Sequence, residues 1–160
     1  MLRITKQTDY GIMLLARMAE LPAGHLFSAR DAAEWSGLSR PLVRKILKSL
    51  AREQIIASQR GAGGGYALMS SPQQTTVARV IRALEGPISI VECGSQPGQC
   101  GQEPICPTRV NWARINRQIE QALDRIPISE MATLPAGDCA GPSASEALSL
   151  GGGRGAEKPS

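Results

Sequence analysis

Aromatic side chains and histidine are scarce in this chain of 160 residues. Phe, Trp and Tyr make up 3% of the sequence, and His25 is the only histidine. We therefore expect an aliphatic core. No histidine stands near any cysteine to act as the base beside a nucleophile, so we predict that the protein is not an enzyme.

Long apolar runs are also missing. No segment is apolar over the length needed to cross a bilayer, and the first six residues lack the apolar run of a signal peptide. We expect a cytoplasmic protein with no membrane partner. Thiols stay reduced there, so clustered cysteines indicate metal or redox chemistry more often than a structural disulfide. Large apolar residues are nearly absent from residues 135–160, which we predict to be a disordered tail.

Positive charge is concentrated in the first part of the chain. Residues 1–60 contain ten Lys and Arg and five Asp and Glu, a net charge of +5, whereas the whole chain carries +4. The remainder therefore has a net charge of −1. This distribution favours an anionic polymer as the partner of the first part, although ordinary solubility charge is an alternative.

Helix-capping residues predict a helix-turn-helix in the same region. Thr8 can cap a first helix that ends near Leu21. Ser28 can cap a second helix over residues 29–35, which Gly37 ends at the turn typical of this motif. Ser39 can cap a third helix, whose predicted core-facing residues are Leu42, Ile46, Leu47 and Leu50.

Cations occupy a separate face of the third predicted helix. Arg40, Arg44 and Lys48 recur every four residues without acidic partners at the i+4 positions. A solvated helix face is the alternative, but like charges four residues apart repel unless an anion lies opposite. We therefore predict a recognition helix. Its predicted DNA-binding residues are Ser39, Arg40, Arg44, Lys45 and Lys48.

A glycine-rich hairpin follows this helix. Two short predicted strands, 55–59 and 66–69, flank the segment Arg60-Gly-Ala-Gly-Gly-Gly65. A nucleotide-binding loop is excluded because no Gly-Lys-Ser/Thr follows and the segment leads into a strand. We predict a DNA-binding wing, in which Gly63 and Gly64 let the backbone approach DNA and Arg60 enters a minor groove. Residues 1–86 are thus predicted to be a winged helix-turn-helix domain.

The rear of the chain combines a short helix, a cysteine loop and a long helix. We predict a helix over 76–84, a cluster-binding loop over 87–107, and a dimerisation helix with an end segment over 108–134. Apolar residues in the long helix are spaced by three and four, as in a heptad seam. A helix packed on its own domain is the alternative. Helix-turn-helix proteins usually bind two half-sites as two-fold dimers, which favours a homodimer. The seam consists of Trp112, Ile115, Ile119, Ala122 and Ile126.

Three cysteines stand in the predicted loop: Cys93, Cys100 and Cys106. Thiolates are soft ligands suited to iron–sulfur clusters, zinc or Cu(I). Structural zinc usually has four ligands on closely paired arms, which this spacing does not provide. A wide Gly/Pro loop favours an iron–sulfur cluster. Free thiols or a reversible disulfide are the alternatives.

The predicted fold class is mainly α with a small β-wing.

Three segments of the chain resemble the Rrf-type winged-helix regulators, the family of the IscR, NsrR and SUF-system regulators. These are Leu2-Arg-Ile-Thr-Lys-Gln-Thr-Asp-Tyr10, Arg60-Gly-Ala-Gly-Gly-Gly-Tyr66 and the loop with the three cysteines before a long helix. The likeness covers roughly residues 1–130. It implies a homodimer on palindromic promoter DNA, with a 2Fe–2S or 4Fe–4S cluster held by those cysteines.

The resemblance also bears on the fourth cluster ligand. Where the IscR-like pattern has a histidine three residues after the last cysteine, this chain has Arg109. In nitric-oxide-sensing relatives an aspartate of the other subunit is the fourth ligand, and Asp9 occupies the matching place. Asp9 could instead serve only as a negative charge that stabilises the start of the first helix. Further candidates are Glu92, Glu103 and Cys139.

We therefore predict a transcriptional regulator that senses iron–sulfur cluster status and controls SUF-type assembly genes. The alternatives are a nitric-oxide-responsive or iron-responsive repressor of the same family and a metal-free thiol redox sensor.

Overall fold

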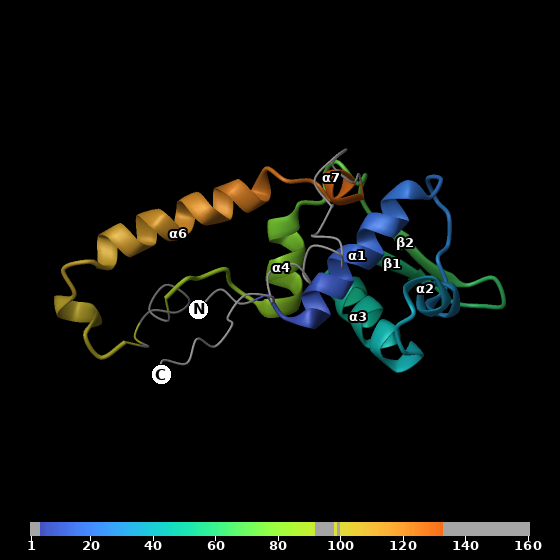
Figure 1. Cartoon of the computed structure of the whole chain (residues 1–160), viewed down its shortest axis with the longest axis horizontal. Coiled ribbons are helices and arrows are strands. Elements are labelled where there is room, and N and C mark those ends of the chain that lie inside the picture. Colours follow the sequence, from blue (N-terminus) through green and yellow to red (C-terminus); the bar gives the residue numbers. More distant parts are fainter. Residues whose placement is uncertain (1–3, 92–97, 99, 133–160) are drawn as a thin grey trace, which may run out of the picture.

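The computed structural model describes residues 4–91, 98 and 100–132 (Figure 1). Three helices come first, followed by a two-stranded hairpin, a fourth helix, a 3-10 turn and two further helices. In chain order these are α1 (Lys6–Glu20), α2 (Ala29–Ser36), α3 (Arg40–Arg52), β1 (Ile56–Gln59), β2 (Gly65–Leu68), α4 (Val77–Glu85), η1 (Glu103–Ile105), α6 (Arg109–Asp124) and α7 (Ile128–Ala132). The predicted class, mainly α with a small β-wing, is confirmed. The predicted tail, 135–160, lies outside the described residues.

The first helix begins three residues earlier than its sequence predicts. Thr5, not Thr8, is the N-cap, and its hydroxyl accepts a hydrogen bond from the Thr8 N–H. Thr8 lies fully buried inside the first turn, and its hydroxyl donates to Glu85 at the end of α4. Two threonines three residues apart are both acceptable caps. The contact with α4 decides between them, and local sequence cannot show it.

The helix-turn-helix forms as predicted. The Ser28 hydroxyl accepts a hydrogen bond from the Asp31 N–H at 3.1 Å, and Gly37 ends α2 with a φ of +69°. Such a left-handed conformation favours glycine because it has no Cβ. Ser39 is the N-cap residue of α3, but its side chain makes no capping hydrogen bond.

The wing is an antiparallel hairpin that is fastened to the helices. Ile56 pairs with Leu68 and Gln59 pairs with Gly65. Phe27, just before α2, extends the sheet, because its N–H donates to the Tyr66 carbonyl at 2.8 Å and its carbonyl accepts from the Tyr66 N–H at 3.0 Å. The base of the wing is therefore fixed relative to the helix-turn-helix.

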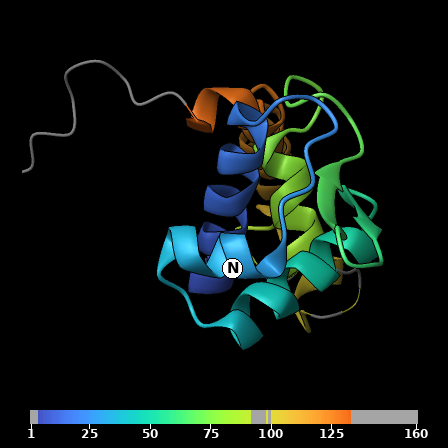
Figure 2. The ribbon, with the colours of Figure 1, turned by 90° about the vertical axis from the view of Figure 1, so that its right-hand side faces the viewer.

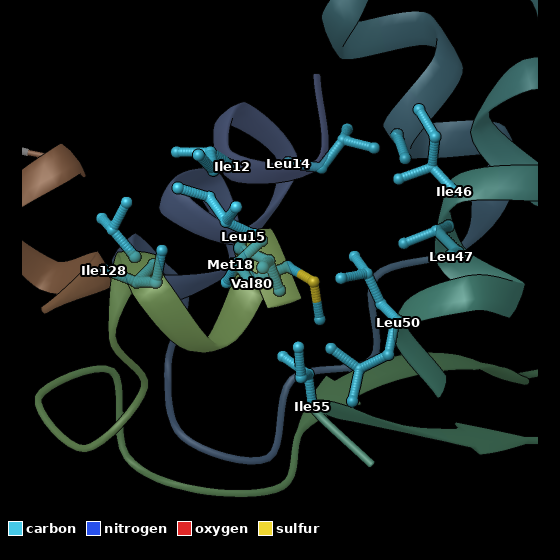
Figure 3. Packing of buried hydrophobic residues seen from close by; sticks show 14 of the residues in the cluster. Ile12, Leu14, Leu15, Met18, Ile46, Leu47, Leu50, Ile55, Val80 and Ile128 are labelled. Atoms are coloured by element: carbon cyan, nitrogen blue, oxygen red, sulfur yellow. The ribbon is translucent and has the colours of Figure 1, made fainter. Parts of the chain in front are cut away.

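The core is aliphatic and lies between α1, α3 and α4 (Figure 3). Leu14, Leu15 and Leu50 are completely buried, as are Val43, Ile46 and Leu47 of α3. Of the four residues predicted to face the core from α3, Leu42 is only partly buried, and Val43 takes its place in the core.

After α6 the chain returns to this core. The Val77 N–H donates to the Ile126 carbonyl at 2.9 Å, and the Ile128 N–H donates to the Thr75 carbonyl at 2.8 Å. Ile128 is fully buried, and α7 packs against α1. Figure 2 shows α7 in orange at one end of α1, with α4 alongside. The α6 helix itself runs away from the helical body (Figure 1). No helix in the described ranges is long and apolar enough to cross a membrane.

Candidate nucleic-acid interface and cysteine loop

The cations of α3 lie on its outer face. Val43, Ile46, Leu47 and Leu50 bury the opposite side, and the cations stand at exposed positions between them. The exposed residues of α3 and its N-cap include all five that the sequence predicts to bind DNA: Ser39, Arg40, Arg44, Lys45 and Lys48.

These cations have no carboxylate partners in the part of the chain that is described. The ion pairs there join Arg17 to Glu20, Arg52 to Glu53, and Arg82 to two acids of α6. Arg52, which flanks the stripe, is thus partly neutralised by Glu53 at 3.1 Å. The stripe of Arg40, Arg44, Lys45 and Lys48 keeps its positive charge for an external anion.

The α3 helix and the wing share one groove. A hollow of about 470 Å³ lies between them, and Lys48 contributes one wall. Gln59, Arg60 and Gly64 line the side formed by the hairpin. The structure therefore brings Lys48 and Arg60, two of the predicted DNA-binding residues, to the same concave surface.

The two wing glycines differ in what surrounds them. A Cβ at Gly64 would overlap the carbonyl oxygen of Gln59 and lie 3.0 Å from that of Gly61. A Cβ at Gly63 would meet nothing within 4 Å. Gly64 is therefore required for the shape of the hairpin, whereas Gly63 is free to face a ligand. The sequence prediction, which assigned both residues to backbone approach, did not separate these roles.

Two of the three predicted cluster ligands lie in the described residues. Cys100 and Cys106 are partly buried free thiols, whereas Cys93 lies outside the described residues. The Cys106 sulfur lies 3.4 Å from the Thr108 hydroxyl oxygen. Hydrogen bonds from the Thr108 side chain and backbone lower the pKa of Cys106, with a smaller contribution from Arg109. A lowered pKa favours the thiolate, the form that binds metals.

The donor chemistry of this loop suits a soft metal or an iron–sulfide cluster. Among residues 4–91, 98 and 100–132, no three His, Cys, Asp or Glu side chains come together as a metal site. Of the candidate fourth ligands, Asp9 is exposed in the first turn of α1, and Glu103 begins η1. Glu92 and Cys139 lie outside the described residues, and Arg109 begins α6.

The α6 helix has two differently used faces. On the face towards α4, Arg82 donates to Glu120 and to Asp124, each at 2.8 Å, and Leu123 packs against the core, as does Ile126 just beyond the helix. The Asp124 hydrogen bond raises the pKa of Arg82, and Arg82 lowers the pKa of Asp124. On the neighbouring face Trp112 and Ile115 are 39% and 37% exposed. The predicted heptad seam is therefore not buried within this chain over its first half.

Sequence reasoning missed the residues that join distant elements. Arg82 and Asn116 join the long helix to α4 and to residues 88–90, whereas Glu85 joins α4 to the start of α1. No spacing pattern pairs any of them with its partner. Opposite charges in neighbouring helices were the one available hint, for Arg82 with Glu120 and Asp124.

A helix-turn-helix with an exposed cationic third helix and an attached wing defines a winged-helix DNA-binding protein. The family model Rrf2, described as an iron-dependent transcriptional regulator, matches residues 4–133. The chain belongs to the Rrf2 family of transcriptional regulators and is not an enzyme. The family resemblance found in the sequence is thus confirmed.

Solved structures of three similar proteins share this fold. CymR, the global cysteine regulator of B. subtilis, is 29% identical, with a TM-score of 0.65 over 82% of this chain and 97% of that one. The oxidized form of Staphylococcus aureus CymR is 25% identical, with a TM-score of 0.61 over 84% and 98%. T. potens IscR is 25% identical, with a TM-score of 0.57 over 96% and 94%.

Proposed function

We propose that this regulator binds an iron–sulfur cluster through Cys93, Cys100 and Cys106 and adjusts its operator affinity to the state of that cluster. The observation that carries the proposal is the pair Cys100 and Cys106, two free thiols in one loop, together with the hydrogen bonds of Thr108 that lower the pKa of Cys106 just before α6. Similarity to T. potens IscR along most of both chains supports it. The genes controlled would be those of SUF-type cluster assembly.

The DNA-binding part of the proposal assigns a role to each cation. Arg40, Arg44, Lys45 and Lys48 meet bases and phosphates of the major groove, while Arg60 enters the minor groove. Ser39 lies at the start of the same helix. Gly63, whose Cα faces open space, lets the wing backbone approach the duplex, and Gly64 shapes the wing that presents Arg60.

A homodimer is part of the same proposal. An apolar stripe on α6, formed by Trp112, Ile115 and Ile119, needs a partner, since the first two residues are more than a third exposed. A two-fold dimer would bury these stripes and place two recognition helices on a palindromic site.

The test is to purify the protein without oxygen and to measure iron, acid-labile sulfide and the visible absorption spectrum. We expect brown protein that contains iron and sulfide, and loss of both in Cys106→Ser. Operator affinity should differ between the holo and apo forms by about 5- to 150-fold, the usual range of allosteric coupling. Colourless protein without iron and sulfide that still binds DNA at full strength would contradict the proposal.

A metal-free thiol sensor is the second candidate, and one observation favours it. The chain is similar to CymR, including a structure of its oxidized form, and both described loop thiols are free to react. In this case Cys100 and Cys106 pair on oxidation. Mass spectrometry after peroxide treatment and thiol blocking would detect that disulfide, and a reductant would restore operator affinity.

A nitric-oxide-responsive or iron-responsive repressor would instead lose its cluster to nitric oxide or to iron depletion.

A further inference from the structure

The first part of the cysteine loop is held by one side chain of α6. Residues 88–91, which we call the strap, lie shortly after the end of α4 and lead towards the cysteines. The Asn116 side-chain oxygen accepts a hydrogen bond from the Ile90 N–H at 3.1 Å, and its nitrogen donates to the Ile88 carbonyl at 2.8 Å. One side-chain amide thus binds two backbone groups of the strap that lie two residues apart.

The start of the strap is anchored in the core, because Ile88 is buried there and Ser89 is 2% exposed. Asn116 lines two hollows along α6, one of about 390 Å³ beside Ile88 and one of about 290 Å³ beside Val91. The amide of Asn116 is therefore placed where the strap could otherwise move.

The same helix holds both ends of the cysteine loop. At the far end the Arg109 N–H donates to the Cys106 carbonyl at 3.4 Å, where α6 begins. Asn116 follows Arg109 by two helical turns, about 10 Å along the axis. A change in the loop therefore acts on α6 at two separated points.

A continuous set of contacts leads from Asn116 to the recognition helix. One turn further along α6, Glu120 binds Arg82 of α4 at 2.8 Å, and Asp124 binds it one turn beyond that. α4 packs against α1 and α3. Where these helices meet, a Cβ at Gly11 would lie 2.7 Å from Leu84 of α4 and 3.5 Å from Ile46 of α3. Such close packing transmits a shift of α4 to α3 instead of absorbing it.

We propose that Asn116 is a positioning residue that couples the cysteine loop to the recognition helix. It fixes the strap on α6, so that the state of the loop sets the position of α6 and, through Arg82, of α4 and α3. The sensing role rests on the function proposed above, whereas the clamp itself is a property of the protein without any cofactor. The described hydrogen bonds of Asn116 go to the strap and not to Cys100, Cys106 or α3, so it acts only through these contacts.

The first measurement is amide hydrogen exchange at Ile90 in the cofactor-free protein. Asn116→Leu removes both hydrogen bonds, so exchange at Ile90 should be at least about tenfold faster, because protection reflects the local opening equilibrium. Asn116→Asp keeps the acceptor for Ile90 but loses the donor to Ile88, and it should give an intermediate rate. Gln118→Leu, an exposed position on α6, should leave the rate unchanged. Equal exchange rates in all four proteins would overturn the clamp.

The second measurement is the ratio of DNA affinities in two states of the loop. The probe is a duplex selected from random sequence by the wild-type protein, measured with protein reconstituted with Fe²⁺ and sulfide and with apo protein blocked by N-ethylmaleimide. In Asn116→Leu the ratio between the two states should fall to within about twofold of one, and in Gln118→Leu it should match the wild type. A merely structural role would weaken both states equally and leave the ratio intact.

The outcomes separate this inference from the proposed function. If the wild type shows no difference between the two states, the proposed sensing fails and the relay fails with it. If the wild type shows a difference that Asn116→Leu and Asn116→Asp both retain, the sensing stands and the relay is overturned. Circular dichroism of each variant verifies that it is folded, and Asn116→Asp supplies the test should Asn116→Leu not fold.

Discussion

The Glu85 carboxylate accepts two hydrogen bonds from Thr5, one from its N–H at 2.9 Å and one from its hydroxyl at 2.6 Å. A third comes from the Thr8 hydroxyl. These bonds tie the first turn of α1 to the last residue of α4. Since residues 86–91 follow immediately, this junction also fixes where the strap begins.

The first prediction concerns the pH dependence of this junction. Burial raises the pKa of Glu85, but the hydrogen bonds from Thr5 and Thr8 outweigh it, so the pKa is lower than the ordinary value of 4.5. A depressed pKa means that the stabilisation is fully present above the unfolded-state pKa and is lost as the pH falls through the folded-state pKa. Glu85→Gln should lower the free energy of unfolding at pH 7 by on the order of 1 kcal/mol, a value reduced by solvent exposure.

Urea denaturation of the wild type and Glu85→Gln at pH 7 and pH 3 checks this. The difference between the two proteins should be larger at pH 7 and should shrink towards zero at pH 3. Glu34→Gln, at an exposed carboxylate of α2, is the matched control. A constant difference at both pH values would mean that the junction does not depend on ionised Glu85.

The second prediction concerns the recognition helix. Arg44→Ala and Lys48→Ala should each weaken binding to all duplexes and lower the salt slope by about one, as expected for the loss of one phosphate contact. Fluorescence anisotropy at several salt concentrations measures both quantities. Arg114→Ala, on the exposed side of α6, should change neither. Unchanged affinity and slope in the two α3 variants would show that another surface binds DNA.

The third prediction compares two adjacent glycines of the wing. Gly64→Ala should destabilise the protein by about 1–3 kcal/mol, the usual cost of forcing an atom into a filled space, because its Cβ would overlap the Gln59 carbonyl. Gly63→Ala has open space around the new atom and should leave stability within about 0.5 kcal/mol. Thermal unfolding distinguishes the two variants. Equal destabilisation in both would show that the hairpin does not need its observed geometry at Gly64.

The fourth prediction concerns the apolar stripe on α6. Ile115→Glu places a charge among Trp112 and Ile119 and should shift a dimer towards monomer by at least tenfold in dissociation constant, because burying an unpaired charge is costly. Sedimentation equilibrium across a range of concentrations measures this. Gln121→Glu, at an exposed polar position of the same helix, is the control. An identical dissociation constant for Ile115→Glu would rule out this face as the interface.

Local sequence patterns were sufficient to predict the elements of the front part. Ser28 and Gly37 mark the ends of α2 because capping chemistry is local. The alternation of buried leucines with exposed cations marks α3 because helical spacing is local as well. The exposed placement of Arg44 and Lys48 followed from that spacing.

The junctions between elements could not be predicted in this way. Thr5 and Thr8 are equally good caps, and only Glu85, some eighty residues away, decides which one starts the helix. The burial of Ile128 and the amide contacts of Asn116 depend on how α6 lies relative to α4. Such contacts join residues far apart in sequence, so no periodic pattern of residue types predicts them. The domain limits at 86, 107 and 134 stay predictions.

After α6 the chain returns to the helical body at Pro127, which forms an isolated bridge with Thr76. The excursion that begins at residue 86 leaves the body at the end of α4 and re-enters it at the start of α4, where Pro127 pairs with Thr76, so it is an insertion rather than an appendage. A protein truncated before Ile128 would lose a side chain that is completely buried in the core of the helical body. Changes in the length of the excursion near its far end would leave the contacts of Ile128 with this core in place, so the cysteine loop and the helix-turn-helix can vary separately.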